Sequence, residues 1–187
     1  MADVRMKGFS ERADVEEVER FLAEHARALP AERVALADCI GRVLAEDVTA
    51  AVDVPGFPRS AMDGYAVRGE DTFGASDYDP IALEVIGLSL PGKPFDGALA
   101  PTGGQAVRIM TGAPVPEGAD AVIMAEVCEE DGDTVRVRDA VAPRKNVGVP
   151  GEDIRRGDIV LRPGRRLRPQ DAGMLSSIGV AEVACHR

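Results

Sequence analysis

Apolar side chains near the start of the chain recur at helical spacing, with charged residues between them. These apolar residues are Val15, Val18, Phe21, Leu22 and Leu29. The pattern predicts an amphipathic helix that is capped by Asp14, with Glu17 in a capping-box arrangement, and that ends before Pro30. Its apolar face needs a partner, which is either the rest of this chain or a second subunit.

The next segments alternate between extended and helical patterns. Residues 32–36 predict a short extended piece. A second, shorter helix is expected to follow, with Leu36, Ile40, Val43 and Leu44 on one face and Gly41 lowering its stability. Residues 46–54 predict an extended segment.

From Pro55 onward, glycine and proline become frequent and the apolar runs become short and β-branched. This texture predicts strands in a compact β-rich domain with irregular loops. The expected strands are residues 65–68, 81–88, 105–110, 121–127 and 134–137. Residues 130–133, which read Glu-Asp-Gly-Asp, predict a hairpin turn between the last two of them.

The last part of the chain returns to a mixed pattern. Residues 154–161 predict a Gly157-centred turn and a strand, Pro169 to Gly179 a helix, and residues 180–183 a final strand. The whole pattern predicts an α+β fold. A β-rich domain of residues 51–140 is expected to be inserted into an elongated mixed helix and strand linker domain formed by residues 1–50 and 141–187, in which the helices near both ends pack together.

Composition narrows the classes of function. The 187 residues carry a net charge of −10, aromatic residues are 4% and tryptophan is absent. Nucleic-acid binders and proteins of anionic membrane surfaces need a basic face, so neither partner is expected. The chain shows no secretory signal, and its three widely spaced cysteines form no disulfide framework, which favours the cytoplasm.

Basic residues are locally concentrated between Arg144 and Arg168, against three acidic ones. The cluster fits a solvated protein face first, and the alternative is a local attraction for an anionic substrate or an acidic partner surface.

The first segment that could carry chemistry is residues 53–68, which read DVPGFPRSAMDGYAVR. Its prolines stiffen a loop that presents the hydroxyl of Ser60 and the carboxylate of Asp63 at the start of a strand. The same residues also fit a plain turn in which Asp63 accepts hydrogen bonds from nearby backbone amides.

The second segment is residues 108–126, which read RIMTGAPVPEGADAVIMAE. Thr111 and Gly112 follow a predicted strand, where a hydroxyl and backbone N–H groups could bind an oxyanion. A rigid connection between two strands is the alternative.

The third segment is residues 146–153, which read NVGVPGED. Glu152 and Asp153 are adjacent, so in an extended chain they point to opposite faces and do not bind one metal together. One of them could join Asp63 in holding a hard cation such as Mg²⁺. A turn with an aspartate cap is the structural alternative.

These three segments occur in the same order as the motifs of the MoeA family, which includes the E domain of gephyrin. The chain resembles that family in SAMDGYA at residues 60–66, in RIMTGAPVPEGADAV at 108–122 and in GEDI at 151–154. The resemblance runs from about residue 12 to the end. It implies the N-terminal and linker region of a molybdopterin molybdenumtransferase, with a β-rich subdomain and a helix-bearing linker.

The resemblance also implies a reaction and its partners. Molybdate is inserted into adenylylated molybdopterin, AMP leaves and Mg²⁺ assists. The active site is expected at the interface of a homodimer, facing a third domain that this chain lacks. The protein that adenylylates molybdopterin is a further candidate partner.

The site residues follow by position in the matching motifs. Asp63, Thr111 and Asp153 are implied as catalytic, with Asp63 also as the Mg²⁺ ligand. Cofactor contacts are expected from Ser60, Gly112 and Glu152. The family's arginines just before GED are replaced here by residues 147–150, Val-Gly-Val-Pro, so a phosphate contact from that stretch is not expected.

Two functions remain open at this level. The chain is either a fragment that forms one wall of the transferase site, inactive alone, or a natural interaction module that retains the fold without the catalysis. The abrupt ending after a predicted strand favours the fragment.

Overall fold

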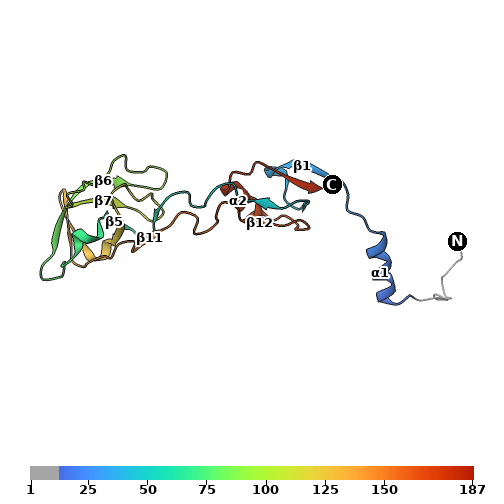
Figure 1. The fold of residues 1–187 in the computed structure, drawn as a ribbon, viewed down its shortest axis with the longest axis horizontal. Helices are drawn as coiled ribbons and strands as arrows, with labels where there is room; N and C mark the ends of the chain where they lie inside the picture. Colours follow the sequence, from blue (N-terminus) through green and yellow to red (C-terminus); the bar gives the residue numbers. More distant parts are fainter. Residues whose placement is uncertain (1–12) are drawn as a thin grey trace, which may run out of the picture.

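The computed structural model describes residues 13–187, which form two lobes in an elongated arrangement with a separate N-terminal helix (Figure 1). The helices are α1 (Val15–His25) and α2 (Pro169–Ser177), with short 3-10 turns η1 (Leu36–Asp38), η2 (Gly69–Thr72) and η3 (Ala125–Val127). The strands are β1 (Ala31–Ala35), β2 (Val43–Leu44), β3 (Val48–Thr49), β4 (Arg59–Ser60), β5 (Gly64–Val67), β6 (Ile81–Ser89), β7 (Gln105–Ile109), β8 (Ala121–Met124), β9 (Cys128–Asp131), β10 (Thr134–Val137), β11 (Val147–Gly148), β12 (Ile159–Leu161) and β13 (Glu182–His186).

The β-rich lobe is built on a six-stranded sheet of order β8-β5-β7-β6-β10-β9. All neighbours are antiparallel except β6 and β7, which are parallel. The chain passes from one edge strand, β8, to the other, β9, through the single turn of η3. In addition, the phenol of Tyr65 on β5 donates a hydrogen bond to Glu130 on β9. The sheet is therefore curled so that its two edges approach each other.

Alternating side chains give this sheet two apolar faces, as the period of a strand requires. Tyr65, Val67 and Ala106 lie in one core together with side chains of β6 and β10. Ala66, Val107 and Ile109 lie in the other, which the loops after β6 and β7 cover. Because β5 is buried on both faces, its position is strongly fixed and so is the loop that precedes it.

The second lobe draws its core from both ends of the described chain, residues 34–54 and 154–185. β13 lies between β1 and β2, β12 pairs with β3, and Leu175 of α2 is fully buried against them. The two chain segments that join the lobes run side by side (Figure 1), because Val54 and Ile154 form an antiparallel bridge. The domain boundaries at residues 50/51 and 140/141, and the insertion that they imply, stay predictions.

Most predicted strands are confirmed. Those expected at 65–68, 81–88, 105–110 and 134–137 are β5, β6, β7 and β10. The predicted strand 121–127 ends at Met124 and gives way to η3, and the hairpin at Gly132 joins β10 to β9, a strand that the pattern did not predict. The Gly157 turn before β12 and the helix that starts at Pro169 are also confirmed, whereas the last strand begins two residues later than predicted.

The helix predicted from Leu36 to Leu44 is wrong. The chain makes the single turn η1, turns at Gly41 with a φ of +85° and then forms β2. Leu44 is buried while Ile40 stays half exposed, so the four apolar residues do not share a buried face. Backbone pairing of β2 with β13 competes successfully with a short helix that Gly41 weakens.

The first helix is shorter than predicted, and it lacks the predicted cap and packing partner. α1 ends at His25, since Ala26 has extended backbone, and Asp14 makes no side-chain capping bond, so the capping box with Glu17 does not form. None of its residues is buried, and α1 contributes nothing to the three cores. The prediction that the two terminal helices pack together is therefore wrong: α2 packs into the second lobe, and the apolar face of α1 has no partner within residues 13–187.

Among the residues that the structure describes, no helix is long and apolar enough to cross a membrane.

Candidate active site

The loop between β4 and β5 is held against the loop that follows β7 by backbone hydrogen bonds. The amide of Ser60 donates to the carbonyl of Ala113 at 2.9 Å, and the amide of Gly112 donates to the carbonyl of Ser60 at 2.8 Å. Ser60 is buried, and its hydroxyl donates to the carbonyl of Met62 at 2.6 Å. The side chain thus shapes the turn that carries Asp63, and its predicted cofactor contact stays a prediction.

Asp63 and Thr111 form a direct pair. Both the backbone N–H and the hydroxyl of Thr111 donate to Oδ1 of Asp63, each at 2.7 Å. These bonds favour the charged carboxylate, so the pKa of Asp63 lies below its ordinary value, with the backbone bond the larger cause. The second carboxylate oxygen, Oδ2, makes no hydrogen bond within residues 13–187, so it is available to a ligand.

Removing the hydroxyl of Thr111 is expected to raise the pKa of Asp63. In Thr111→Val the backbone N–H still donates to Oδ1, so the pKa rises only part of the way to its ordinary value. A carboxyl whose pKa is lower in the folded than in the unfolded protein stabilises the fold at any pH above the unfolded pKa. That stabilisation is lost as the pH falls through the folded pKa. Thr111→Val is therefore expected to lose part of it near neutral pH. A carbon-13 NMR titration of the Asp63 carboxyl measures the shift. Thr111→Ser, which keeps the hydroxyl, serves as the control, and an unchanged pKa in Thr111→Val would contradict the assignment.

Glu152 and Asp153 contact the same arginine. Arg59 donates to Oε1 of Glu152 from Nε at 3.0 Å and from Nη2 at 2.6 Å, and Nη2 also lies 3.2 Å from Oδ2 of Asp153. Residues 150–153 form a turn, which is the alternative that the sequence left open for this segment, so the two carboxylates do not take the opposite faces expected of an extended chain. Glu152 also accepts a bond from the amide of Val149 at 3.2 Å, so it braces this turn from within.

Arg59 is the residue of this site that the motif analysis missed. Its pKa is raised above the ordinary arginine value, mainly by the hydrogen bond with Glu152. It stands directly before Ser60 in the first motif, opposite Gly148 in the β4–β11 ladder. A lone arginine in a loop segment gave no signal of its own, because its partners lie 93 and 94 residues away.

Two neighbouring hollows adjoin these residues. One, of about 460 Å³, is lined by Ser60, Thr111, Gly112 and Glu152, together with Arg59, Ala61, Asn146, Val147 and Gly148. The other, of about 470 Å³, is lined by Asp63 and by side chains of β5, β7 and β9. The structure therefore brings four predicted residues into one hollow and places Asp63, bonded to Thr111, on the wall of the next.

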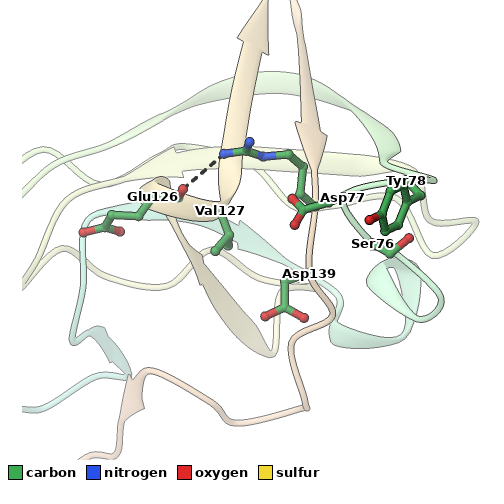
Figure 2. A pocket seen from close by; sticks show the side chains of 8 residues that line it. Ser76, Asp77, Tyr78, Glu126, Val127 and Asp139 are labelled. Atoms are coloured by element: carbon green, nitrogen blue, oxygen red, sulfur yellow. Dashed lines mark hydrogen bonds between the residues drawn. The ribbon is translucent and has the colours of Figure 1, made fainter.

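A further hollow of about 460 Å³ contains none of the predicted site residues (Figure 2). The residues that line it include Asp77, Glu126 and Asp139, and Nη2 of Arg138 donates to the backbone carbonyl of Glu126 at 3.3 Å. The fully exposed Tyr78 lies at its rim. This hollow is a separate feature of the β-rich lobe.

The acidic, histidine and cysteine side chains of the described residues are not grouped as a multi-ligand metal site. Residues 13–187 contain no group of three or more histidine, cysteine or acidic side chains that could hold a metal ion. Mg²⁺, however, is commonly bound through one or two carboxylates, with waters and substrate phosphates completing its shell. The free oxygen of Asp63 fits that mode as a single protein ligand.

The fold of this chain matches that of a molybdopterin biosynthesis protein of known structure. A crystal structure of the moeA protein from Pyrococcus horikoshii OT3 superimposes with a TM-score of 0.83 at 41% identity, covering 91% of this chain and 45% of that one. The model of the MoeA N-terminal region (domain I and II) matches residues 13–179. The chain belongs to this family.

Curated relatives carry a matching name. A molybdopterin molybdenumtransferase of Haemophilus influenzae is 42% identical over 158 residues, which are 83% of this chain and 37% of the relative. Molybdopterin molybdenumtransferase 2 of Mycobacterium tuberculosis is 40% identical over 169 residues, 90% of this chain and 41% of the relative. The chain thus spans about two fifths of the length of these relatives.

Proposed function

We propose that this chain forms one wall of the active site of a molybdopterin molybdenumtransferase, which inserts molybdate into adenylylated molybdopterin and releases AMP. The observation that carries the proposal is the Asp63–Thr111 pair. It joins two of the three motif segments at a hydrogen-bonded carboxylate with one free oxygen. The names of the relatives support molybdopterin as the substrate class.

Asp63 is the residue that we propose as both the Mg²⁺ ligand and a catalytic group. Thr111 fixes Oδ1 through two donors, so Oδ2 is presented in a defined direction. Bound there, Mg²⁺ would neutralise charge on the phosphate oxygens of the substrate. Thr111 keeps its hydroxyl lone pairs beside the neighbouring hollow, and Gly112 lines that hollow with it.

Asp153 and Glu152 are proposed to complete this wall, with their negative charge partly neutralised by Arg59. Arg59 places a positive group 3.2 Å from Asp153 within this chain. Arg59 thereby reduces the repulsion between these two carboxylates and an anionic substrate in the hollow that it lines with Glu152. Molybdenum insertion by a protein extended to the length of its relatives, with Asp63 intact and with Asp63→Asn, tests the proposal.

A homodimer is proposed as the assembly, with α1 in its interface. Val18, Phe21 and Leu22 are 46%, 58% and 58% exposed and follow one face of the helix. Leu22→Glu places a charge on that face, so the protein is expected to shift toward the monomer. Its unfolding free energy should change by less than about 0.5 kcal/mol, since the side chain is exposed within the subunit.

Sedimentation equilibrium measures this change in assembly. Ala23→Glu adds the same charge about 100° around α1 from Leu22, outside the face formed by Val18, Phe21 and Leu22, and should leave the association constant unchanged. Equal association of both variants and the unchanged chain would contradict a role of the apolar face.

A further inference from the structure

The hollow beside Asp63 lies where the curled sheet opens. Tyr65 on β5 and Arg108 on β7 are direct partners in the antiparallel ladder, so their side chains share one face. That face also carries the core that contains Tyr65, Val67 and Ala106. Glu130 and Cys128 of β9 approach it from the opposite edge of the sheet. Openings of curled or closed sheets are common places for ligands.

Three polar side chains of this hollow form a chain of contacts. The phenol of Tyr65, which is buried, donates to Oε1 of Glu130. Nη1 of Arg108 lies 3.1 Å from the same oxygen, and the Arg108 side chain is 50% exposed. Glu130 therefore has two partners, of which only the phenol is buried.

Arg108 has side-chain donors that the carboxylates of this hollow do not use. Asp63 already accepts two bonds from Thr111, and Glu130 accepts one from Tyr65. A guanidinium has five N–H donors, and within residues 13–187 Arg108 uses them for one exposed ion pair alone. Exposed ion pairs are weak, so Arg108 can leave Glu130 at little cost while Tyr65 keeps Glu130 bonded.

We propose that Arg108 binds a tetrahedral oxyanion in this hollow, exchanging its ion pair with Glu130 for a charge-assisted contact to the ligand. Molybdate and a phosphate group share that chemistry, and both belong to the reaction proposed above, on which this assignment of ligands rests. The hollow, about 470 Å³, is large enough for the anion and part of the molecule that bears it. Arg108 is then a substrate-binding residue in addition to the predicted site residues.

Titration of the 187-residue chain with sodium molybdate, and separately with sodium phosphate, tests the proposal. Chemical shifts of the Arg108 guanidinium and of neighbouring amides report binding at constant ionic strength. At least one of the two anions is expected to bind with a dissociation constant of roughly 1–10 mM. Arg108→Gln is expected to weaken this binding about tenfold or more.

Arg136→Gln is the matched control. Arg136 has nearly the same exposure, 51%, and a comparable exposed ion pair with Asp131 at 2.8 Å, but it lies on β10 outside this hollow. Anion binding in this variant should stay within about twofold of the unchanged chain, since an exposed surface arginine contributes little. The two titrations also identify the ligand. The anion that causes saturable chemical-shift changes at Arg108, whether molybdate, phosphate or both, is the one that binds there.

Two results would overturn the proposal. One is no saturable binding of either anion up to about 50 mM, which is well above the expected dissociation constant. The other is equal binding by Arg108→Gln and the unchanged chain.

A failure of this proposal is distinguishable from a failure of the proposed function. A protein extended to the relatives' length that inserts no molybdenum contradicts the function but leaves anion binding by Arg108 measurable. Insertion at the normal rate by Arg108→Gln, with unchanged anion binding, contradicts only the role of Arg108.

Discussion

Asp63→Asn, in a protein extended to the length of its relatives, is expected to lower the rate of molybdenum insertion by about 100-fold or more. Asparagine keeps an oxygen that can accept the bonds from Thr111, so the loop should retain its shape. The negative charge and the free carboxylate oxygen are lost, and with them the ability to hold a cation beside the substrate. Formation of the molybdenum cofactor from adenylylated molybdopterin, followed by release of AMP, measures the rate.

Asp139→Asn provides the control for this measurement, because Asp139 is an exposed carboxylate of the separate hollow in Figure 2. It should insert molybdenum at the normal rate. Undiminished insertion by Asp63→Asn would show that Asp63 has only a structural role in its turn. If the extended protein with Asp63 intact inserts no molybdenum, the non-catalytic interaction module becomes the better explanation.

Gly64→Ala is expected to destabilise the protein by about 3 kcal/mol or more. A β-carbon at position 64 would lie 1.9 Å from the carbonyl oxygen of Ile123, and φ is +159° there. The neighbour is backbone of β8, paired with β5, so the clash cannot be relieved by rotating a side chain. The strand must move, and because Asp63 is the adjacent residue, its bonds with Thr111 are expected to lengthen.

Gly173→Ala is the matched control, since it makes the same chemical change where the structure has room. Gly173 lies in α2, and nothing stands within 4 Å of an added β-carbon. Alanine is a better helix former, so this variant should be neutral or more stable by about 0.5–1 kcal/mol. Urea unfolding measures both. Equal stability of the two variants would mean that β8 yields to the added methyl group.

The sequence predicted those parts of the fold in which local pattern and tertiary contacts agree. β5, β6, β7 and β10 carry short apolar runs, and each contributes buried side chains to a core of the sheet. Leu36 to Leu44 has helical spacing, but pairing with β13, about 140 residues later, decided its structure. The local sequence does not show that a segment will pair with a distant strand, which is why this helix was predicted wrongly.

The sequence also predicted only some of the residues of the candidate site. The pairing of Asp63 with Thr111 joins two motifs that the sequence had singled out, although only the fold shows that the two touch. Arg59 escaped notice because its importance depends on Glu152 and Asp153, which become its neighbours only through β4 and β11. The sequence left a turn open at residues 151–153, but it could not show that this turn brings both carboxylates to one guanidinium.

The pairing of β1 with β13 also sets an order of assembly during synthesis. Ala31 is opposite His186, so the second lobe cannot complete its sheet until nearly all of the described chain has left the ribosome. The six strands of the β-rich lobe lie between residues 64 and 137 and have all emerged by then. Because chains fold in units as they are made, the lobe that carries Asp63 can form first, while the residues around β1 wait for their partner.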